Sequence, residues 1–197
     1  MLFRSGLVST LDHYVWSEAA AQIRQWKARF GVTLPVSVNV SRVDLFDPEL
    51  VEKLRDIISR NGLTCSELLL EITESAYTED AEQIIETVSR LRKLGFRIEM
   101  DDFGSGYSSL NMLMTLPIDV LKLDMQFVRN AFAQRKDTRL LEVMLRLAKS
   151  FGLTTIVEGV ETEEQMLALK LMGCDIVQGY YFSRPLPADK FESFIAK

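Results

Sequence analysis

Two adjacent aspartates, Asp101 and Asp102, close the short run FRIEM and are followed by the small-residue stretch FGSGYSS. At an effective dielectric constant of about 20, two carboxylates roughly 5 Å apart repel each other by about 3 kcal/mol. Such a pair needs a compensating positive charge, and a bound cation is the first candidate. Other chemistry-bearing side chains stand near the ends of several further apolar runs, so they could share the same cation.

These further candidates are two acids, two amides and a lysine: Glu71, Glu158, Asn39, Gln178 and Lys122. Each has an ordinary explanation when taken alone, such as capping a turn or pairing with a neighbour. Taken together, several acids beside one lysine leave an excess of negative charge that is costly to bury. Oxygen ligands without His or Cys select hard cations, Mg²⁺ or Mn²⁺ first and Ca²⁺ second. The single histidine, His13, is expected on the surface of a helix, which excludes an imidazole-rich metal site.

The elements that must position these side chains are short β-rich runs alternating with longer helical patterns, a signature of a parallel α/β fold. The expected strands are 35–41, 67–73, 96–101, 119–124, 154–159 and 175–182. Side chains alternate along a strand, and each of these strands carries a polar residue at or near the end of one face. Because ligands gather at the carboxyl ends of parallel strands, we expect the candidates to converge there.

Helix signals separate the strands. Asp47 followed by Pro48 predicts a helix that begins there and ends at Gly62. Thr78 predicts the start of another helix. Thr162 with Gln165 predicts a capping box at the start of a third helix. Two apolar stripes are expected to face the core: Leu140, Leu141, Met144, Leu147 and Met166, Leu169.

Composition limits the class of protein. The chain has 197 residues, 47% of them hydrophobic, and a net charge of -5, which predicts one globular domain and disfavours a DNA, RNA or anionic membrane surface. No apolar stretch approaches the roughly 20 residues of a membrane span, so the chain is expected in the cytoplasm. Cys65 and Cys174 are expected to be reduced, packed thiols.

Six blocks of this sequence together resemble the EAL domain family of cyclic di-GMP phosphodiesterases. The blocks are VNVS, LLLEITES, EMDDFGSGYSSLNML, PIDVLKLD, IVEGVET and CDIVQGYYFSRPLP, in order and in register. The resemblance implies a (β/α)8 TIM-like barrel with one antiparallel strand. It also implies hydrolysis of cyclic di-GMP to linear pGpG with two Mg²⁺ or Mn²⁺ ions.

The resemblance also implies roles for the candidates. Asn39, Glu71 and Asp101 look like metal ligands, and Asp102 with Asp101 looks like a ligand of the second ion. Glu158 resembles a general base or second-metal ligand, and Lys122 the residue that orients the attacking water. Gln178 looks like a supporting residue. Glu74 resembles the glutamate that anchors the loop from 103 to 109. The resemblance also implies a homodimer that forms through the region around residues 103–115.

Parts of the family pattern are missing. The Glu-Ala-Leu motif, a nearby arginine and the first two strands have no counterpart, so we expect an incomplete barrel with about six strands. We expect residues 1–5, MLFRS, to be a non-native start and residues 6–197 to be a partial EAL domain. The parent protein is then expected to be a phosphodiesterase. An upstream sensor or GGDEF domain, and a membrane anchor, are compatible with the sequence but are not indicated by it.

Two questions stay open at this point. A catalytically inactive cyclic di-GMP receptor, or a protein-interaction domain, is the alternative to an enzyme. Glu99 shares the inward face of Asp101, and both Arg97 and Lys122 are candidate partners for it.

Overall fold

The computed structural model describes residues 6–77, 81–104, 110–132 and 138–195. Within these ranges the chain forms one sheet of six parallel strands in the order β1-β2-β3-β4-β5-β6. The strands are β1 (Val36–Asn39), β2 (Leu68–Thr73), β3 (Ile98–Phe103), β4 (Val120–Leu123), β5 (Thr154–Val157) and β6 (Ile176–Val177). This curved sheet is part of a (β/α)8-like barrel, as the sequence predicts, and the antiparallel strand is not among these six.

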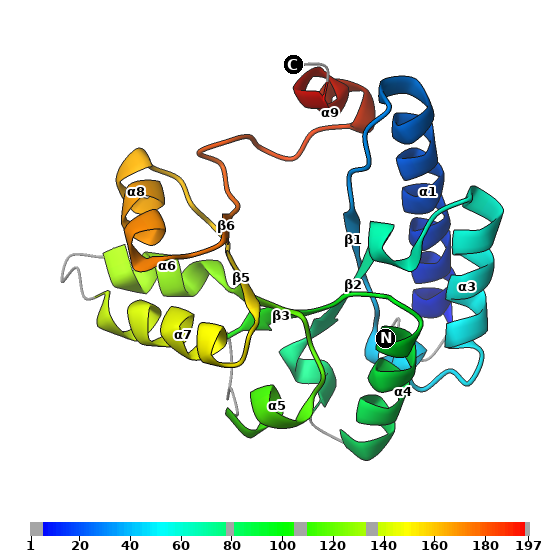
Figure 1. Cartoon of the computed structure of the whole chain (residues 1–197), viewed down its shortest axis with the longest axis horizontal. Helices are drawn as coiled ribbons and strands as arrows, with labels where there is room; N and C mark the ends of the chain where they lie inside the picture. The colour runs from blue at the N-terminus through cyan, green and yellow to red at the C-terminus, as the bar shows by residue number, and fades with distance from the viewer. Residues whose placement is uncertain (1–5, 78–80, 105–109, 133–137, 196–197) are drawn as a thin grey trace.

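Helices lie around the outside of the sheet (Figure 1). They are α1 (Leu7–Phe30), α2 (Arg42–Leu45), α3 (Leu50–Asn61), α4 (Ala81–Lys93), α5 (Leu110–Thr115), α6 (Met125–Phe132), α7 (Arg139–Ser150), α8 (Glu163–Met172) and α9 (Ala188–Ile195). Two 3-10 helices, η2 (Cys65–Glu67) and η3 (Glu74–Tyr77), flank β2. The segment between β6 and α9 crosses to α1, where Trp26 and Phe191 have ring centroids 5.4 Å apart.

Alternation along the strands separates an apolar outer face from an inner face that carries the charged side chains. In β2, Leu68, Leu70 and Ile72 are fully buried in the core between sheet and helices. Their neighbour Glu71 points to the opposite face, because successive side chains of a strand alternate. A register slip of one residue would bury the acids and expose the leucines, so packing of the outer face fixes where the acids lie.

Several local predictions are confirmed and others are wrong. Gly62 ends α3 with φ 63°, and Thr162 with Gln165 forms the capping box of α8. Helix α3 starts at Leu50 rather than after Asp47, because Asp47 accepts a hydrogen bond from the Glu49 N–H within a turn that precedes the helix. The predicted start at Thr78 lies outside the described residues, as does the predicted non-native start at 1–5.

The last strand and one core residue also differ from expectation. β6 ends at Val177 instead of 182, because the chain turns at Gly179, where an added Cβ would lie 2.1 Å from the Val160 carbonyl oxygen. Leu140 is 64% exposed, since the buried stripe of α7 passes through Leu141 and Met144. The predictions for His13, which is exposed, and for the two free thiols are confirmed.

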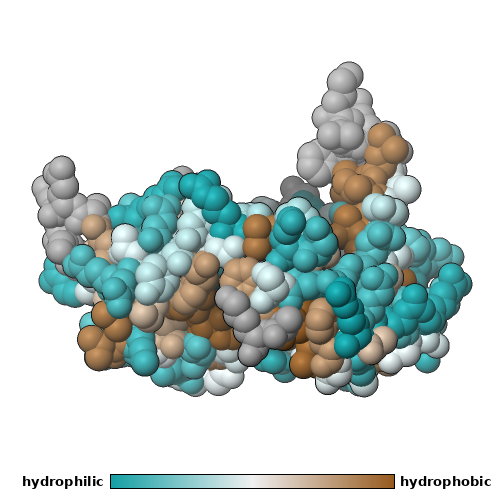
Figure 2. Space-filling view, turned by 90° about the horizontal axis from the view of Figure 1, so that it is seen from above, coloured by the Kyte–Doolittle hydropathy of each residue, from teal (hydrophilic) through white to brown (hydrophobic). Residues whose placement is uncertain are grey.

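The surface combines hydrophilic and hydrophobic areas. In Figure 2 brown hydrophobic patches are interspersed among teal residues on the face seen from above. β1 and β6 each have one strand neighbour within the described ranges, so both are sheet edges. Among the described helices, none is both long and apolar enough to cross a membrane.

A pair of acids, Asp12 in α1 and the buried Asp44 in α2, joins these two helices. Asp44, which is 1% exposed, accepts hydrogen bonds from Ser9 and Ser41 and shares a further hydrogen bond with Asp12. Burial, the hydrogen bond to Asp44 and the charge of Asp44 raise the pKa of Asp12 from 3.8 to about 6. One proton between the two carboxyl groups therefore favours the contact between these helices.

The Asp12 pair makes stability depend on pH. The folded state holds the Asp12 proton more tightly than the unfolded state, so this stabilisation is present at low pH and is lost as the pH rises from 3.8 through about 6. Asp12→Asn supplies a hydrogen-bond donor at every pH. The free energy of unfolding of this variant, relative to that of the wild type, should therefore increase as the pH rises from 3.8 through about 6. Urea unfolding at several pH values measures the difference. The exposed α1 variant Glu18→Gln is the control, and a difference for Asp12→Asn that does not change with pH contradicts the account.

Candidate active site

Lys122 lies at the centre of three acids on the inner face of the sheet. Its Nζ is 2.6 Å from Glu71 Oε1, 2.8 Å from Glu158 Oε1 and 3.0 Å from Asp101 Oδ1. It donates hydrogen bonds to Glu71 and Glu158, whereas the contact with Asp101 is an ion pair without hydrogen-bond geometry. Four of the residues singled out in the sequence therefore meet at one place.

Four neighbouring strands supply this cluster. Glu71 is in β2, Asp101 in β3 and Lys122 in β4, and Glu158 directly follows β5. The Glu158 N–H donates to the Leu123 carbonyl at 3.1 Å, which continues the pairing of β4 with β5 past the end of the strand. The parallel register thus brings together groups that lie up to 87 residues apart in the sequence, from 71 to 158.

The cluster is largely shielded from water. The side chains of Lys122, Glu71, Asp101 and Glu158 are 7%, 12%, 16% and 24% exposed. Burial raises the pKa of Glu71 and of Glu158, and the Lys122 charge opposes this rise in part. Burial alone would lower the pKa of Lys122, but hydrogen bonds to Glu158 and Glu71 raise it above its ordinary value. Lys122 is therefore a permanent cation.

The backbone turns Asp102 away from this cluster. Asp102 has a φ of 55°, and the pairing of β3 with β4 shifts register between Met100 and Phe103. The side chain is exposed and forms no ion pair with Lys122. Partial shielding and the charges of Asp101 and Asp124 raise its pKa. The two aspartates thus face different surroundings, and only Asp101 has a close cation among the described residues.

The remaining candidates lie at the rim of the sheet. Asn39 ends β1 as the register partner of Glu71, and its side chain is exposed while its carbonyl accepts from Trp16 Nε1 at 2.8 Å. Gln178 follows β6 and is also exposed. Glu74 Oε2 accepts a hydrogen bond from the Gly104 N–H at 3.2 Å, at the start of the loop it is predicted to anchor. Residues 105–109 of that loop lie outside the described residues.

The sequence prediction did not include Asp124 among the site residues, and it left the partner of Glu99 open. Asp124 directly follows β4, on the same strand parity as Lys122, and its charge helps to raise the pKa of Asp102. Because Asp124 lies two residues after Lys122, strand alternation places it on the same face, and this signal could have identified it. Glu99 is 1% exposed, and among the described residues it pairs with neither Arg97 nor Lys122.

The donor set suits a hard divalent cation. In the described part of the chain, no three His, Cys, Asp or Glu side chains stand close enough together to hold a metal ion. The acids are arranged around the Lys122 ammonium group instead. Their oxygens, with the Asn39 amide, are nevertheless the ligand types that Mg²⁺, Mn²⁺ and Ca²⁺ take.

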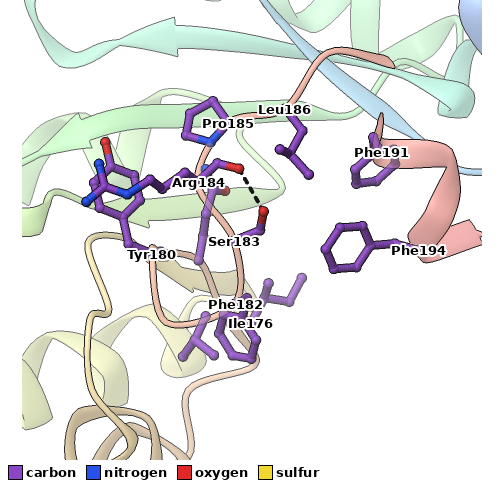
Figure 3. Close-up of a pocket in the computed structure, with 12 residues that line it drawn as sticks. Ile176, Tyr180, Phe182, Ser183, Arg184, Pro185, Leu186, Phe191 and Phe194 are labelled. Carbon is purple, nitrogen blue, oxygen red and sulfur yellow. Dashed lines mark hydrogen bonds between the residues drawn. The ribbon is translucent and has the colours of Figure 1, made fainter. Parts of the chain in front are cut away.

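A pocket of about 550 Å³ lies beside Gln178, at the free edge of β6. Figure 3 shows aromatic and apolar side chains from the segment after β6 and from α9 around it, including Tyr180, Phe182 and Phe191. Arg184 stacks over the Tyr180 ring with its guanidinium carbon 4.7 Å from the ring centroid. Gln178 is the one predicted site residue in its lining.

Known proteins share much of this sequence. The EAL domain family profile matches residues 1–185. The cyclic di-GMP phosphodiesterase NbdA of Pseudomonas aeruginosa is 37% identical over 191 residues, covering 97% of this chain and 24% of that protein. The chain thus spans about a quarter of the length of such curated relatives.

Solved structures show the same likeness. The PaMucR phosphodiesterase in its c-di-GMP complex has a TM-score of 0.88 and 34% identity, covering 95% of this chain and 76% of that one. The manganese/cy-diGMP complex of Klebsiella pneumoniae BlrP1 has a TM-score of 0.80 and 29% identity. The match covers 89% of this chain and 44% of the BlrP1 chain.

Replacing Lys122 by methionine should destabilise the metal-free chain. The change leaves three shielded carboxylates without their cation, which costs about 3–5 kcal/mol of unfolding free energy. Chemical denaturation with a chelator present measures the loss. Lys53→Met is the matched control, because Lys53 pairs with Asp47 and Glu49 at the surface and its loss should cost about 1 kcal/mol or less. Equal losses in the two variants would contradict the central role given to Lys122.

Proposed function

This chain belongs to the EAL domain family, and we propose that it supplies most of the active site of a phosphodiesterase that hydrolyses cyclic di-GMP to linear pGpG. The observation that carries the proposal is the meeting of Glu71, Asp101 and Glu158 around Lys122. The likeness to NbdA and to the PaMucR complex supports cyclic di-GMP as the substrate.

The proposed cofactors are two divalent ions, Mg²⁺ or Mn²⁺. Asn39, Glu71 and Asp101 would hold one ion, and Asp101 with Asp102 and Glu158 would hold the other. When bound, such ions supply positive charge that activates water and offsets the charge of a phosphodiester. The manganese and calcium complexes of BlrP1 support a need for divalent ions in this family.

Lys122 and Glu158 have distinct proposed roles. The raised pKa of Lys122 keeps its ammonium group charged, so it is suited to orient a water and to stabilise the negative charge that gathers on the phosphate. Glu158 is more exposed than Glu71 and its pKa is raised by burial. A carboxylate of this kind at the rim can accept a proton from the attacking water.

Other parts of the proposal concern the rest of the protein. Gln178 would support the substrate beside β6, and Glu74 would hold the start of the loop at Gly104. The free edges of β1 and β6 would be completed by strands from a preceding segment that carries the Glu-Ala-Leu motif. We further propose a cytoplasmic domain that forms a homodimer through the region around 103–115, in a parent protein with an upstream sensor or GGDEF domain.

The proposed function predicts metal-dependent release of pGpG by the protein that includes the preceding segment. Glu158→Gln removes the proposed proton acceptor, so the turnover rate should fall about 10²- to 10⁴-fold. Chromatography of the nucleotide products, with Mg²⁺ or Mn²⁺ at saturating substrate, measures this rate.

Glu161→Gln is the matched control for that assay. Glu161 is an exposed glutamate three residues further along the chain, and this variant should keep the wild-type rate. If the wild-type protein releases no pGpG with either metal, the proposal is wrong. Cyclic di-GMP binding by calorimetry without turnover would then favour a receptor.

A further inference from the structure

Glu99 is a deeply buried acid that the proposed mechanism does not use. The residue is 1% exposed, and its Oε2 has no hydrogen-bond partner among the described residues. A carboxylate buried in this way is unfavourable unless a cation or donors compensate its charge. The charged groups around Glu99 therefore determine whether its carboxylate is compensated.

The strand register places Glu99 beside Glu71. The two residues are direct partners in the parallel pairing of β2 with β3, so their Cα atoms lie about 4.8 Å apart and their side chains share one face. Glu99 also shares this face with Asp101, two residues closer to the strand end. The charge of Glu99 acts on Glu71, since it is one of the causes that raise the Glu71 pKa.

The neighbouring cations are paired with other acids or exposed to solvent. Lys122 makes its ion pairs with Glu71, Asp101 and Glu158. Arg97 is exposed and forms no ion pair with Glu99 among the described residues. Among the described residues, the inner face therefore carries four shielded carboxylates, those of Glu71, Asp101, Glu158 and Glu99, around the single ammonium group of Lys122.

We propose that Glu99 is a further cation-binding residue, whose carboxylate holds a divalent ion together with that of Glu71 on the inner face of β2 and β3. Carboxylate oxygens are the preferred ligands of Mg²⁺ and Mn²⁺, and an ion there offsets the charge that Lys122 leaves uncompensated. The inference rests on the proposed function, because it adds a ligand to the same divalent-ion site. It requires no turnover to be tested.

The test combines two measurements on the 197-residue chain: calorimetric titration with MnCl₂, and thermal unfolding in the presence of a chelator. Glu99→Gln should weaken Mn²⁺ binding about tenfold or more. The same variant should unfold, without metal, at the wild-type temperature or above it, because it removes an uncompensated buried charge. Glu99→Ala should bind Mn²⁺ at least as weakly as Glu99→Gln.

Glu67→Gln is the matched control, because Glu67 is also buried, at 3% exposed, but is paired with Lys27 at 2.9 Å. It should bind Mn²⁺ as wild type does and unfold at a lower temperature. Unchanged Mn²⁺ binding by Glu99→Gln would overturn this inference and leave the proposed function in place. Weaker binding accompanied by a lower metal-free unfolding temperature would also overturn it, since Glu99 would then act through the fold. A wild-type chain that binds no Mn²⁺ would overturn the proposed metal site as well.

Discussion

The structure depends on the attraction between one shielded ammonium group and three carboxylates that come from different strands. Lys122 sits within 3.0 Å of an oxygen from each of Glu71, Asp101 and Glu158. Each of these charges would be unfavourable alone in such a shielded position, because an unpaired charge loses its hydration without compensation. The apolar outer face of the sheet supports the cluster, since packing of residues such as Leu70 fixes the register that aims Glu71 inward.

This part of the molecule could be predicted from the sequence because it follows from strand alternation. Once the strands were placed, parity put Glu71, Asp101 and Lys122 on one face, and the structure brings them together. Parity did not predict the position of Asp102, because a register shift and a positive φ rotate that side chain away. The turn at Gly179 ended β6 early for a similar reason, since close approach to the Val160 backbone is a tertiary contact.

The partners of buried charges were the hardest feature to predict. The sequence left Glu99 between Arg97 and Lys122, and the structure pairs it with neither. Lys122 makes its ion pairs with Glu71, Asp101 and Glu158 instead. A surplus of acids over bases on one inner face is a reason to expect divalent ions, because each ion brings two charges into a small volume. Among the described strands β1 and β6 form the two edges of the sheet, and the edge at β6 lies beside the aromatic pocket of Figure 3.

The most direct test of the central claim is a crystal structure of the chain grown with Mn²⁺ and cyclic di-GMP, with the ions located by anomalous scattering. The account predicts anomalous peaks about 2.0–2.6 Å from carboxylate oxygens of Glu71 and Asp101, with a phosphate of the nucleotide beside Lys122. Peaks found only at surface acids, with Lys122 still holding all three carboxylates and no nucleotide on the inner face, would contradict it.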